Sequence, residues 1–334
     1  YYSGGNLEKQ LRDVSLIYLH KRGRWHLIRF FFSLVTTLKK LKPDVVNSYM
    51  PETNLLSVFL KPFLKCPIVW GIRASNMSSG SYGLVSKLAL QAESLLSRYV
   101  DHTIVNSHAG YQVCAERGFH LSKMSVVHNG IDTANYAPLK NKPNNKFRGS
   151  LGVKHDDILV GIVARLDPMK DHLTFFKAIK IIVNRCPKTI FACIGSGQHH
   201  YQTYLEKQVK LLGIEDRVIF TGQISDMVTV YNGLDILCSS SKYGEGFPNV
   251  IGEAMACGTP CVVANVGDAG IIVGTTGITV SVSNAAELAD GLSEMISRIQ
   301  KNMVKSSEIR GRVIANFSVN LLAAKTLKIY QALI

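Results

Sequence analysis

The sequence predicts an α/β protein of two domains, each a parallel sheet with helices on its faces. Short β-branched runs alternate with helical stretches along most of the chain, and this alternation is typical of parallel strands joined by helical crossovers. The length of 334 residues suits about two domains. Residues 137–150 are rich in Pro, Asn, Lys and Gly and lack apolar periodicity, which predicts a linker. Two domains joined by a linker enclose a cleft, where ligands of open parallel sheets bind.

Each expected element follows from a β-branched run or from helical apolar spacing. In the first half, strands are expected at residues 14–19, 44–49, 68–72, 102–106 and 124–127, with helices at about 24–42, 53–64, 83–99 and 108–117. In the second half, strands are expected at 158–164, 189–194, 218–220, 236–239 and 261–264, with helices at about 171–185, 201–212, 226–232 and 248–257. No strand is expected after residue 280, where 285–299, 305–316 and 319–334 are predicted to be closing helices. The predicted domains are 1–136 and 151–317, and 318–334 is expected to pack back on the first domain.

The positive charge is unevenly placed. The chain carries 38 Lys and Arg against 24 Asp and Glu, which gives +14. Residues 1–148 hold 20 basic and 8 acidic side chains, or +12, and residues 149–334 hold 18 and 16, or +2. This asymmetry argues against a uniform nucleic-acid coat and favours an anionic partner facing the first half. With 46% apolar and 19% charged residues, the chain can bury a sizeable core and is not a disordered protein.

Neither a membrane span nor a secretory signal is predicted. The longest apolar stretch, residues 27–38, is interrupted by Arg29 and is too short to cross a bilayer. The chain opens with Tyr1 and Tyr2 rather than with a signal peptide, and the lack of an initiating Met is typical of a fragment. The cysteines are odd in number and never spaced C-x-x-C, which favours buried free thiols in a reducing cytosol.

Two cations lie at the predicted carboxyl end of a strand. Arg165 follows the run 158–164 and Lys170 comes five residues later, just before a predicted helix. A planar guanidinium and a compact ammonium at a strand end suit a diphosphate. On spacing alone, two solvated surface cations are an equally good interpretation.

A second candidate region surrounds a predicted helix start. Pro248 suits the first turn of a helix and Gly258 suits its end. Free amides over residues 247–250 form an anion site, which Glu245 and Glu253 flank in the sequence. Carboxylates accept hydrogen bonds from neutral hydroxyls, so the pattern predicts a ligand with both phosphate and sugar hydroxyls. The alternative is that Glu245 interacts with the helix dipole and Glu253 is solvated.

These residues carry a family resemblance. The segment EGFPNVIGEAMACGTPCVVA, with Glu245 and Glu253 eight residues apart, resembles the signature of family 4 glycosyltransferases (glycosyl transferases group 1), which are retaining enzymes of the GT-B fold. The segment VARLDPMKDH resembles the phosphate-binding Arg/Lys loop of that family, and VNS at 105–107 and HNGID at 128–132 resemble two further landmarks. The resemblance covers nearly the whole chain in the right order.

The resemblance implies a role for each site residue. Arg165 and Lys170 would neutralise the diphosphate as it leaves, and Glu245 would bind hydroxyls of the donor sugar. Glu253 would bind the ribose hydroxyls. Amides and side chains near Phe247, Pro248 and Asn249 would hold sugar and phosphate, and the loop beginning at Gly222 and Gln223 would lie by the base. The donor would be UDP- or GDP-linked, with no other cofactor and no metal, because nothing here resembles an Asp-x-Asp metal loop.

Two departures from the family pattern concern the first domain. The family opens with a strand, a glycine-rich loop and a helix. The chain is expected to begin after them, since 14–19 resembles a later strand, so the first domain is expected to be incomplete. Many relatives also place a His after the strand equivalent to 68–72, where this chain reads WGIRASN. Arg73 and Asn76 are therefore candidates for contacts to sugar or acceptor, with structural loop residues as the alternative.

The basic segment 20–42 combines Trp25, three Phe and seven Lys or Arg. Its apolar residues suit the core face of a helix, while its cations could dock on anionic lipid headgroups. This segment predicts a cytoplasmic protein bound peripherally to the inner face of the membrane.

The leading functional prediction is a retaining glycosyltransferase that moves a sugar from a nucleotide sugar to a lipid-linked or polysaccharide acceptor in cell-surface glycan synthesis. One alternative is a nucleotide-sugar epimerase or a glycogen-synthase-like enzyme of the same fold. The other is a non-enzymatic basic module binding membrane or nucleic acid, which would not need Glu245 or Glu253. The residues leave open the donor sugar, the base, the acceptor, the oligomeric state, the organism and whether the chain is active as it stands.

Overall fold

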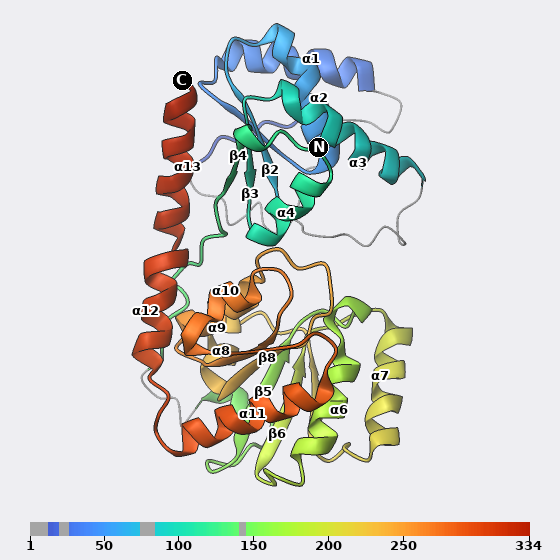
Figure 1. The fold of residues 1–334 in the computed structure, drawn as a ribbon, viewed down its shortest axis with the longest axis vertical. Coiled ribbons are helices and arrows are strands. Elements are labelled where there is room, and N and C mark those ends of the chain that lie inside the picture. The colour runs from blue at the N-terminus through green and yellow to red at the C-terminus, as the bar shows by residue number, and fades with distance from the viewer. Residues whose placement is uncertain (1–12, 20–26, 74–83, 140–144) are drawn as a thin grey trace.

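A computed structural model describes residues 13–19, 27–73, 84–139 and 145–334. Two α/β domains follow one another along the long axis of the molecule, and the two C-terminal helices run beside both (Figure 1). The prediction of a strand at 14–19 is wrong, because this segment has no regular secondary structure. Its apolar side chains are exposed, with Val14 58%, Leu16 45% and Ile17 49% accessible, so the segment lacks the burial that strands of parallel sheets require.

The first domain contains a four-stranded parallel sheet in the order β1-β2-β3-β4. Its strands are β1 (Val46–Tyr49), β2 (Ile68–Ile72), β3 (His102–Val105) and β4 (Met124–Val126), so four of the five predicted strands are confirmed to within two residues at either end. Its helices are α1 (Leu27–Leu41), α2 (Pro51–Leu60), α3 (Leu84–Leu96) and α4 (His108–Glu116), and short 3-10 turns are η2 (Lys61–Phe63), η3 (Ser97–Tyr99) and η4 (Leu121–Lys123).

The second domain contains a six-stranded parallel sheet in the order β10-β9-β8-β5-β6-β7. Its strands are β5 (Ile158–Val163), β6 (Thr189–Ile194), β7 (Val218–Gly222), β8 (Ile236–Ser239), β9 (Cys261–Ala264) and β10 (Ile278–Val280). Its helices and 3-10 turns are α5 (Lys146–Ser150), η5 (Pro168–Lys170), α6 (His172–Ile182), α7 (His199–Leu212), α8 (Met227–Gly233), α9 (Asn249–Ala256), α10 (Ala269–Val273), η6 (Gly274–Thr276) and α11 (Ala285–Gln300).

Apolar clusters on both faces of this second sheet bury its strands. One face packs Leu159, Leu237 and Val263 under α8, α9 and α10, and the other packs Val160 and Val262 under α6 and α11. Strands buried on both sides are nearly continuous apolar runs, which is why most of them could be predicted. The polar chemistry is consequently confined to the loops at the strand ends.

The segment predicted to be a linker packs in part against the second domain. Residues 140–144 lie outside the described residues, and 145–150 hold α5, which lies against α8. The guanidinium of Arg148 donates to the carboxylate of Asp235 at 2.6 Å and to the carbonyl of Gly233 at 3.1 Å.

The last two helices, α12 (Ser306–Phe317) and α13 (Val319–Leu333), join the domains. Ile131 of the first domain exchanges backbone hydrogen bonds with Phe317 (2.7 Å) and Val319 (3.1 Å). A Cβ at Gly130 would lie 2.7 Å from the Cα of Val319, so only glycine allows this close crossing. Helix α13 then runs along the first domain (Figure 1). There the hydroxyl of Tyr330 accepts a hydrogen bond from the side-chain amide nitrogen of Asn47.

Candidate active site

Two loops of the second domain meet at the carboxyl edge of its sheet. One follows β5 and carries Arg165 and Lys170; the other follows the neighbouring strand β8 and carries Glu245. The loops are joined by hydrogen bonds from the amide of Lys242 to the carbonyl of Met169 (2.9 Å) and from Ser240 Oγ to the carbonyl of Lys170 (2.8 Å). Neighbouring parallel strands therefore bring together residues that are 75 positions apart.

Lys170 and Glu245 form an ion pair between their Nζ and Oε1 atoms. Their side chains are only 16% and 13% exposed, so solvent screens this pair less than a surface pair. Ser241 Oγ donates to the same carboxylate oxygen at 2.8 Å. The site thus holds an ammonium and a carboxylate in fixed positions, able to face a phosphate and a hydroxyl.

Asp171 fixes the backbone immediately after Lys170. It adopts a left-handed conformation (φ 48°, ψ 50°) and caps α6 by accepting from the amide of Thr174 at 3.3 Å. Its Oδ2 also accepts from Thr174 Oγ1 and Ser283 Oγ, both at 2.8 Å. A non-glycine residue is rarely left-handed, so these hydrogen bonds hold a turn that aims Lys170.

Arg165 stands at the end of β5 with its side chain 73% exposed. Its guanidinium lies 4.0 Å from Asp167, whose carboxylate accepts from the amide of Met169 at 2.9 Å. The guanidinium is thus loosely held and open to an anion from solvent.

Helix α9 begins one residue later than its sequence predicts, with Pro248 at the N-cap and Asn249 as the first helical residue. Phe247 is buried and packs against the rings of His128 and Phe317, with centroids 5.5 and 5.4 Å away. The side-chain amide nitrogen of Asn129 donates to Asn249 Oδ1 at 2.9 Å. The start of α9 is consequently seated against the first domain.

Glu253 points to α8 rather than to solvent. Its Oε2 accepts a 2.7 Å hydrogen bond from the hydroxyl of Tyr231, and the ring of Tyr231 contacts that of Tyr136 at 5.9 Å. Burial raises the pKa of Glu253, although the bond from Tyr231 lowers it in part. Burial, with Glu253 nearby, also raises the pKa of Tyr136 to about 12.

Gly222 and Gln223 lie at the same edge of the sheet, two strands from β5. Gly222 ends β7 in a left-handed conformation (φ 70°), and its carbonyl accepts from the amide of Gly195 at 2.9 Å. Gln223 is exposed. Neither residue takes part in the Lys170–Glu245 ion pair. That they lie near the base of a nucleotide stays a prediction.

On the first domain, Arg73 follows β2 and its guanidinium lies 4.9 Å from the ring centroid of Tyr49. Asn76 lies outside the described residues. The structure adds Asn106, a buried residue whose amide nitrogen donates to Asn129 Oδ1 at 3.3 Å and to the carbonyl of Arg73 at 3.5 Å. Its Oδ1 is buried and has no hydrogen-bond partner within the described part of the chain.

Sequence reasoning missed Ser241, Tyr231 and Asp268, and it identified Asn106 only as part of the VNS landmark at 105–107. Asp268 and two first-domain histidines, His108 and His128, form one group with metal-like spacing among the described residues. Both carboxylate oxygens of Asp268 already accept hydrogen bonds from backbone amides. For Ser241, Tyr231 and Asp268 the only sequence signal was position, because each lies just after a strand or in a helix that follows one.

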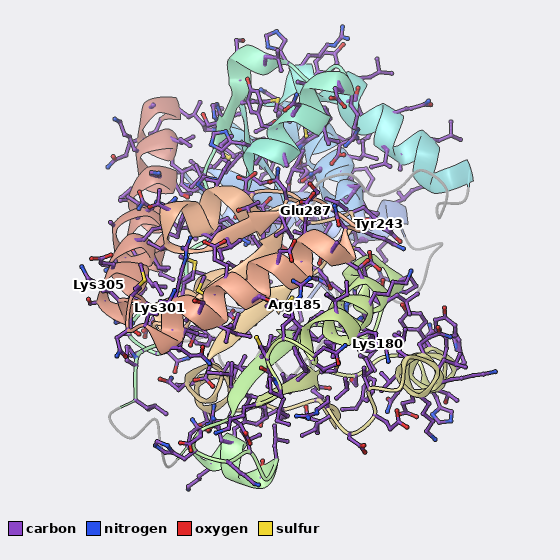
Figure 2. All side chains as sticks on the ribbon, turned by 60° about the horizontal axis from the view of Figure 1, so that its bottom comes forward. Lys180, Arg185, Tyr243, Glu287, Lys301 and Lys305 are labelled. Atoms are coloured by element: carbon purple, nitrogen blue, oxygen red, sulfur yellow. The ribbon has the colours of Figure 1, made fainter. Side chains whose placement is uncertain are left out.

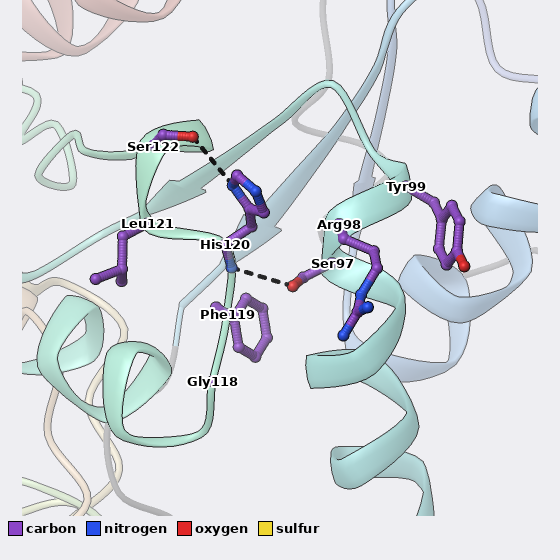
Figure 3. A pocket seen from close by; sticks show the side chains of 8 residues that line it. All are labelled: Ser97, Arg98, Tyr99, Gly118, Phe119, His120, Leu121 and Ser122. Atoms are coloured by element: carbon purple, nitrogen blue, oxygen red, sulfur yellow. Dashed lines mark hydrogen bonds between the residues drawn. The ribbon is translucent and has the colours of Figure 1, made fainter.

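A pocket of about 580 Å³ lies elsewhere, on the first domain. Figure 3 shows it between two loops, with Ser122 Oγ 3.0 Å from His120 Nδ1 and the amide of His120 donating to Ser97 Oγ at 3.3 Å. These loops precede β3 and β4 and so lie at the opposite edge of the sheet from Arg73. Its size therefore does not make it the catalytic site.

Two family models match this chain in succession. Residues 3–135 match the model described as Glycosyltransferase Family 4, and residues 157–298 match the model described as Glycosyl transferases group 1. The chain belongs to the family 4 glycosyltransferases. The expected family and the two-domain α/β fold are thereby confirmed.

Known proteins similar to this family 4 glycosyltransferase include enzymes and solved structures. The UDP-Gal:alpha-D-GlcNAc-diphosphoundecaprenol alpha-1,3-galactosyltransferase of Escherichia coli is 24% identical over 304 residues, covering 87% of this chain and 76% of that protein. The D-inositol 3-phosphate glycosyltransferase of Corynebacterium glutamicum is 31% identical over 182 residues, or 52% of this chain and 43% of that protein.

Solved structures show the GT-B fold. Anabaena Alr3699/HepE in complex with UDP has a TM-score of 0.82 and 23% identity, covering 91% of this chain and 82% of that one. A glycosyltransferase from Rickettsia africae has a TM-score of 0.84 and 19% identity, covering 99% and 88%. At these identities, the two structures establish the shared fold.

Proposed function

We propose that this glycosyltransferase moves a sugar from a UDP- or GDP-linked donor to a lipid-linked or polysaccharide acceptor, with retention of the anomeric configuration and without a metal ion. The observation that carries the proposal is the half-enclosed Lys170–Glu245 pair, assembled from two neighbouring strand ends. A cation and a hydroxyl-binding carboxylate side by side suit the junction between a phosphate and a sugar.

The chain supplies the charge that departure of a diphosphate requires. When the bond from the anomeric carbon to the phosphate oxygen breaks, negative charge develops on the diphosphate. Lys170, Arg165 and the free amides at the start of α9 are placed to stabilise it. Glu245 orients sugar hydroxyls and Glu253 accepts from ribose hydroxyls.

The acceptor is assigned to the cleft edge of the first domain. Arg73 offers a cation there, and it lines a small cavity together with Asn106 and Asn129. The similar Escherichia coli enzyme is named for a sugar diphosphoundecaprenol acceptor, which supports a lipid-linked acceptor in synthesis of a surface glycan.

The decisive experiment screens UDP-glucose, UDP-galactose, UDP-GlcNAc and GDP-mannose, each with and without EDTA, for hydrolysis and for thermal stabilisation. We expect one donor to raise the melting temperature by mass action and to be hydrolysed slowly, equally with EDTA. Lys170→Ala should remove turnover, and Lys180→Ala should not, because Lys180 is exposed on α6 (Figure 2). Absence of binding to all four donors, or a β-linked product from an α-linked donor by NMR, contradicts the proposal.

We further propose that the first domain docks on the anionic inner surface of the membrane. Within the described residues, no helix is both long and apolar enough to cross a bilayer. The outer face of α1 nevertheless exposes Ile28 (75%) and Phe32 (57%), and Phe59 of α2 is 60% exposed. Lys39 and Lys40 end α1, which gives the apolar and cationic combination of an interfacial helix. Trp25 and the cations before Leu27 lie outside the described residues.

Liposome flotation tests this docking. We expect salt-sensitive binding to anionic vesicles, since each cation near a charged leaflet contributes about 1 kcal/mol. The variant Phe32→Ser with Lys39→Glu should bind less. The matched change Leu211→Ser with Lys210→Glu on the second domain, where Leu211 is 69% exposed, should bind as wild type. Equal binding to neutral vesicles would contradict the proposal.

A further inference from the structure

Asp268 belongs to the second domain, but its carboxylate accepts hydrogen bonds from residues of the first domain. It follows β9 and stands at the N-cap of α10, yet it does not cap that helix. Its Oδ2 accepts from the amide of His108 at 2.8 Å and its Oδ1 accepts from the amide of Ala109 at 3.0 Å. These are the first two residues of α4 in the first domain.

Asp268 completes the cap of α4. Ser107 is the N-cap of that helix and accepts from the amide of Gly110 at 2.9 Å. Ser107 and Asp268 together thus satisfy the first three amides of α4, which have no partner within the helix itself. A carboxylate at this positive end of the helix is also favoured by the helix dipole.

His128 adds a third hydrogen bond from the first domain, with its Nε2 2.9 Å from Asp268 Oδ2. Asp268 is only 1% exposed. Burial alone would raise the pKa of this carboxyl, but the bonds from His128 and the two amides hold it below its ordinary value. A metal ion in the same place would face the amide hydrogens of α4, so a cap explains this cluster better than a metal site does.

The backbone of the loop that carries Asp268 packs on residues 245–246, which include Glu245, the residue proposed to bind the donor sugar. The amide of Asp268 donates to the carbonyl of Gly246 at 2.9 Å. A Cβ on the preceding Gly267 would lie 2.5 Å from the carbonyl oxygen of Glu245, and one on Gly246 would lie 3.0 Å from Asn106 Oδ1. The segment of Glu245 is therefore enclosed between the Asp268 loop and the end of β3.

We propose that Asp268 is a positioning residue that couples contact between the two domains to the placement of Glu245. Its side chain holds α4 and its backbone holds the segment 245–246, so the segment reaches its catalytic position only when the domains are joined. This inference rests on the proposed function, because it assigns Glu245 to the donor sugar.

The test compares Asp268→Asn with wild type in the full chain. We expect kcat to fall about tenfold or more, as for loss of a hydrogen bond to a charged group, measured with the most active donor of the four screened. The Kd for UDP should change less than twofold, because Arg165, Lys170 and Glu253 all belong to the second domain. Amide hydrogen exchange in the peptide 107–112 should accelerate at least tenfold.

Two further variants make the result decisive. His128→Phe removes one hydrogen bond to Asp268 while keeping an aromatic ring against Phe247. It should lower kcat about threefold. This variant decides the case if Asp268→Asn does not fold. The control Asp290→Asn breaks a surface pair with Arg185, which Figure 2 shows on the outer side of the second domain, and should change neither kcat nor exchange.

Each outcome has one meaning. Unchanged kcat or unchanged exchange in Asp268→Asn overturns the coupling, and so does a loss of UDP affinity as large as the loss of kcat. Exchange and UDP binding need no turnover, so if none of the four donors reacts, the proposed function fails while exchange still decides whether Asp268 joins the domains.

Discussion

The hydroxyl of Tyr231 donates a 2.7 Å hydrogen bond to Glu253, a carboxylate that α9 places against α8. Only one carboxylate oxygen is engaged in this bond. The other oxygen can accept from a ligand hydroxyl, and the raised pKa of Glu253 reports the burial of the site. The pKa of a solvated helix carboxylate would not be raised by burial.

Replacing Glu253 by Gln should weaken UDP binding by about tenfold, the cost of a hydrogen bond to a charged group, as measured by calorimetry at pH 7. The same change should slightly raise the melting temperature. Because the folded pKa is raised, the native state favours the neutral acid, and stability is lost as pH rises through the folded pKa. The gain from Gln should therefore vanish below about pH 4, where the carboxyl is protonated in both states.

Tyr231→Phe provides the complementary variant. The Tyr231 bond lowers the pKa of Glu253, so its removal should move the pH at which UDP affinity is lost upward. An unchanged pH profile of UDP binding in Tyr231→Phe would show that Glu253 does not contact the nucleotide.

Lys170 and Glu245 should behave as a coupled pair. Lys170→Met should lower kcat by 10²–10³-fold, on the scale of a removed transition-state donor, and Glu245→Gln by about tenfold. The double variant should be more active than the product of the two single losses predicts, because each single change leaves one half-buried charge unpaired. Kinetics of all four proteins check this, and simple multiplication of the two effects would indicate independent roles.

Most of the fold was predictable because the buried strands and helices are built from apolar residues whose pattern can be recognised in the sequence. The run 189–194 was predicted with the observed bounds, and 158–164 differs from β5 by one residue, since strands buried on both faces are unbroken apolar runs. β10 was not predicted because it has three residues with Thr279 in the middle. The short helix α10, with five residues, gave too little periodicity to detect.

Candidate site residues were predictable only where a single loop shows a recognisable sequence pattern. Arg165, Lys170 and Glu245 follow strands and could be found by position. Asp268 could not, because its partners His108 and Ala109 lie 160 and 159 positions away on another domain. Such a contact depends on how the domains meet, and local propensity holds no information about it.

His172 should make stability fall in mild acid. It is 1% exposed with an unpartnered Nδ1 in the described structure, and burial, followed by the charge of Lys170, lowers its pKa to about 4. The unfolded chain binds a proton near pH 6.5, so stability is complete above that pH and is lost as pH falls toward 4. From pH 7 to 5, wild type should lose about 2 kcal/mol more than His172→Phe. Urea unfolding at both pH values measures this, and parallel losses would refute it.

Asp171→Ala should both destabilise the protein and misplace Lys170. The change removes the N-cap of α6, which costs about 1 kcal/mol, and leaves a left-handed residue without the three side-chain hydrogen bonds that hold it. Asp226→Ala is the matched control, because Asp226 caps α8 through the same pair of bonds to a Thr three residues on, but without a positive φ. We expect similar cap costs by urea unfolding, with kcat reduced at least tenfold only in Asp171→Ala. If Asp171→Gly, which tolerates the left-handed backbone, is as inactive as Asp171→Ala, the side-chain bonds aim Lys170; if it is fully active, the backbone conformation alone does so.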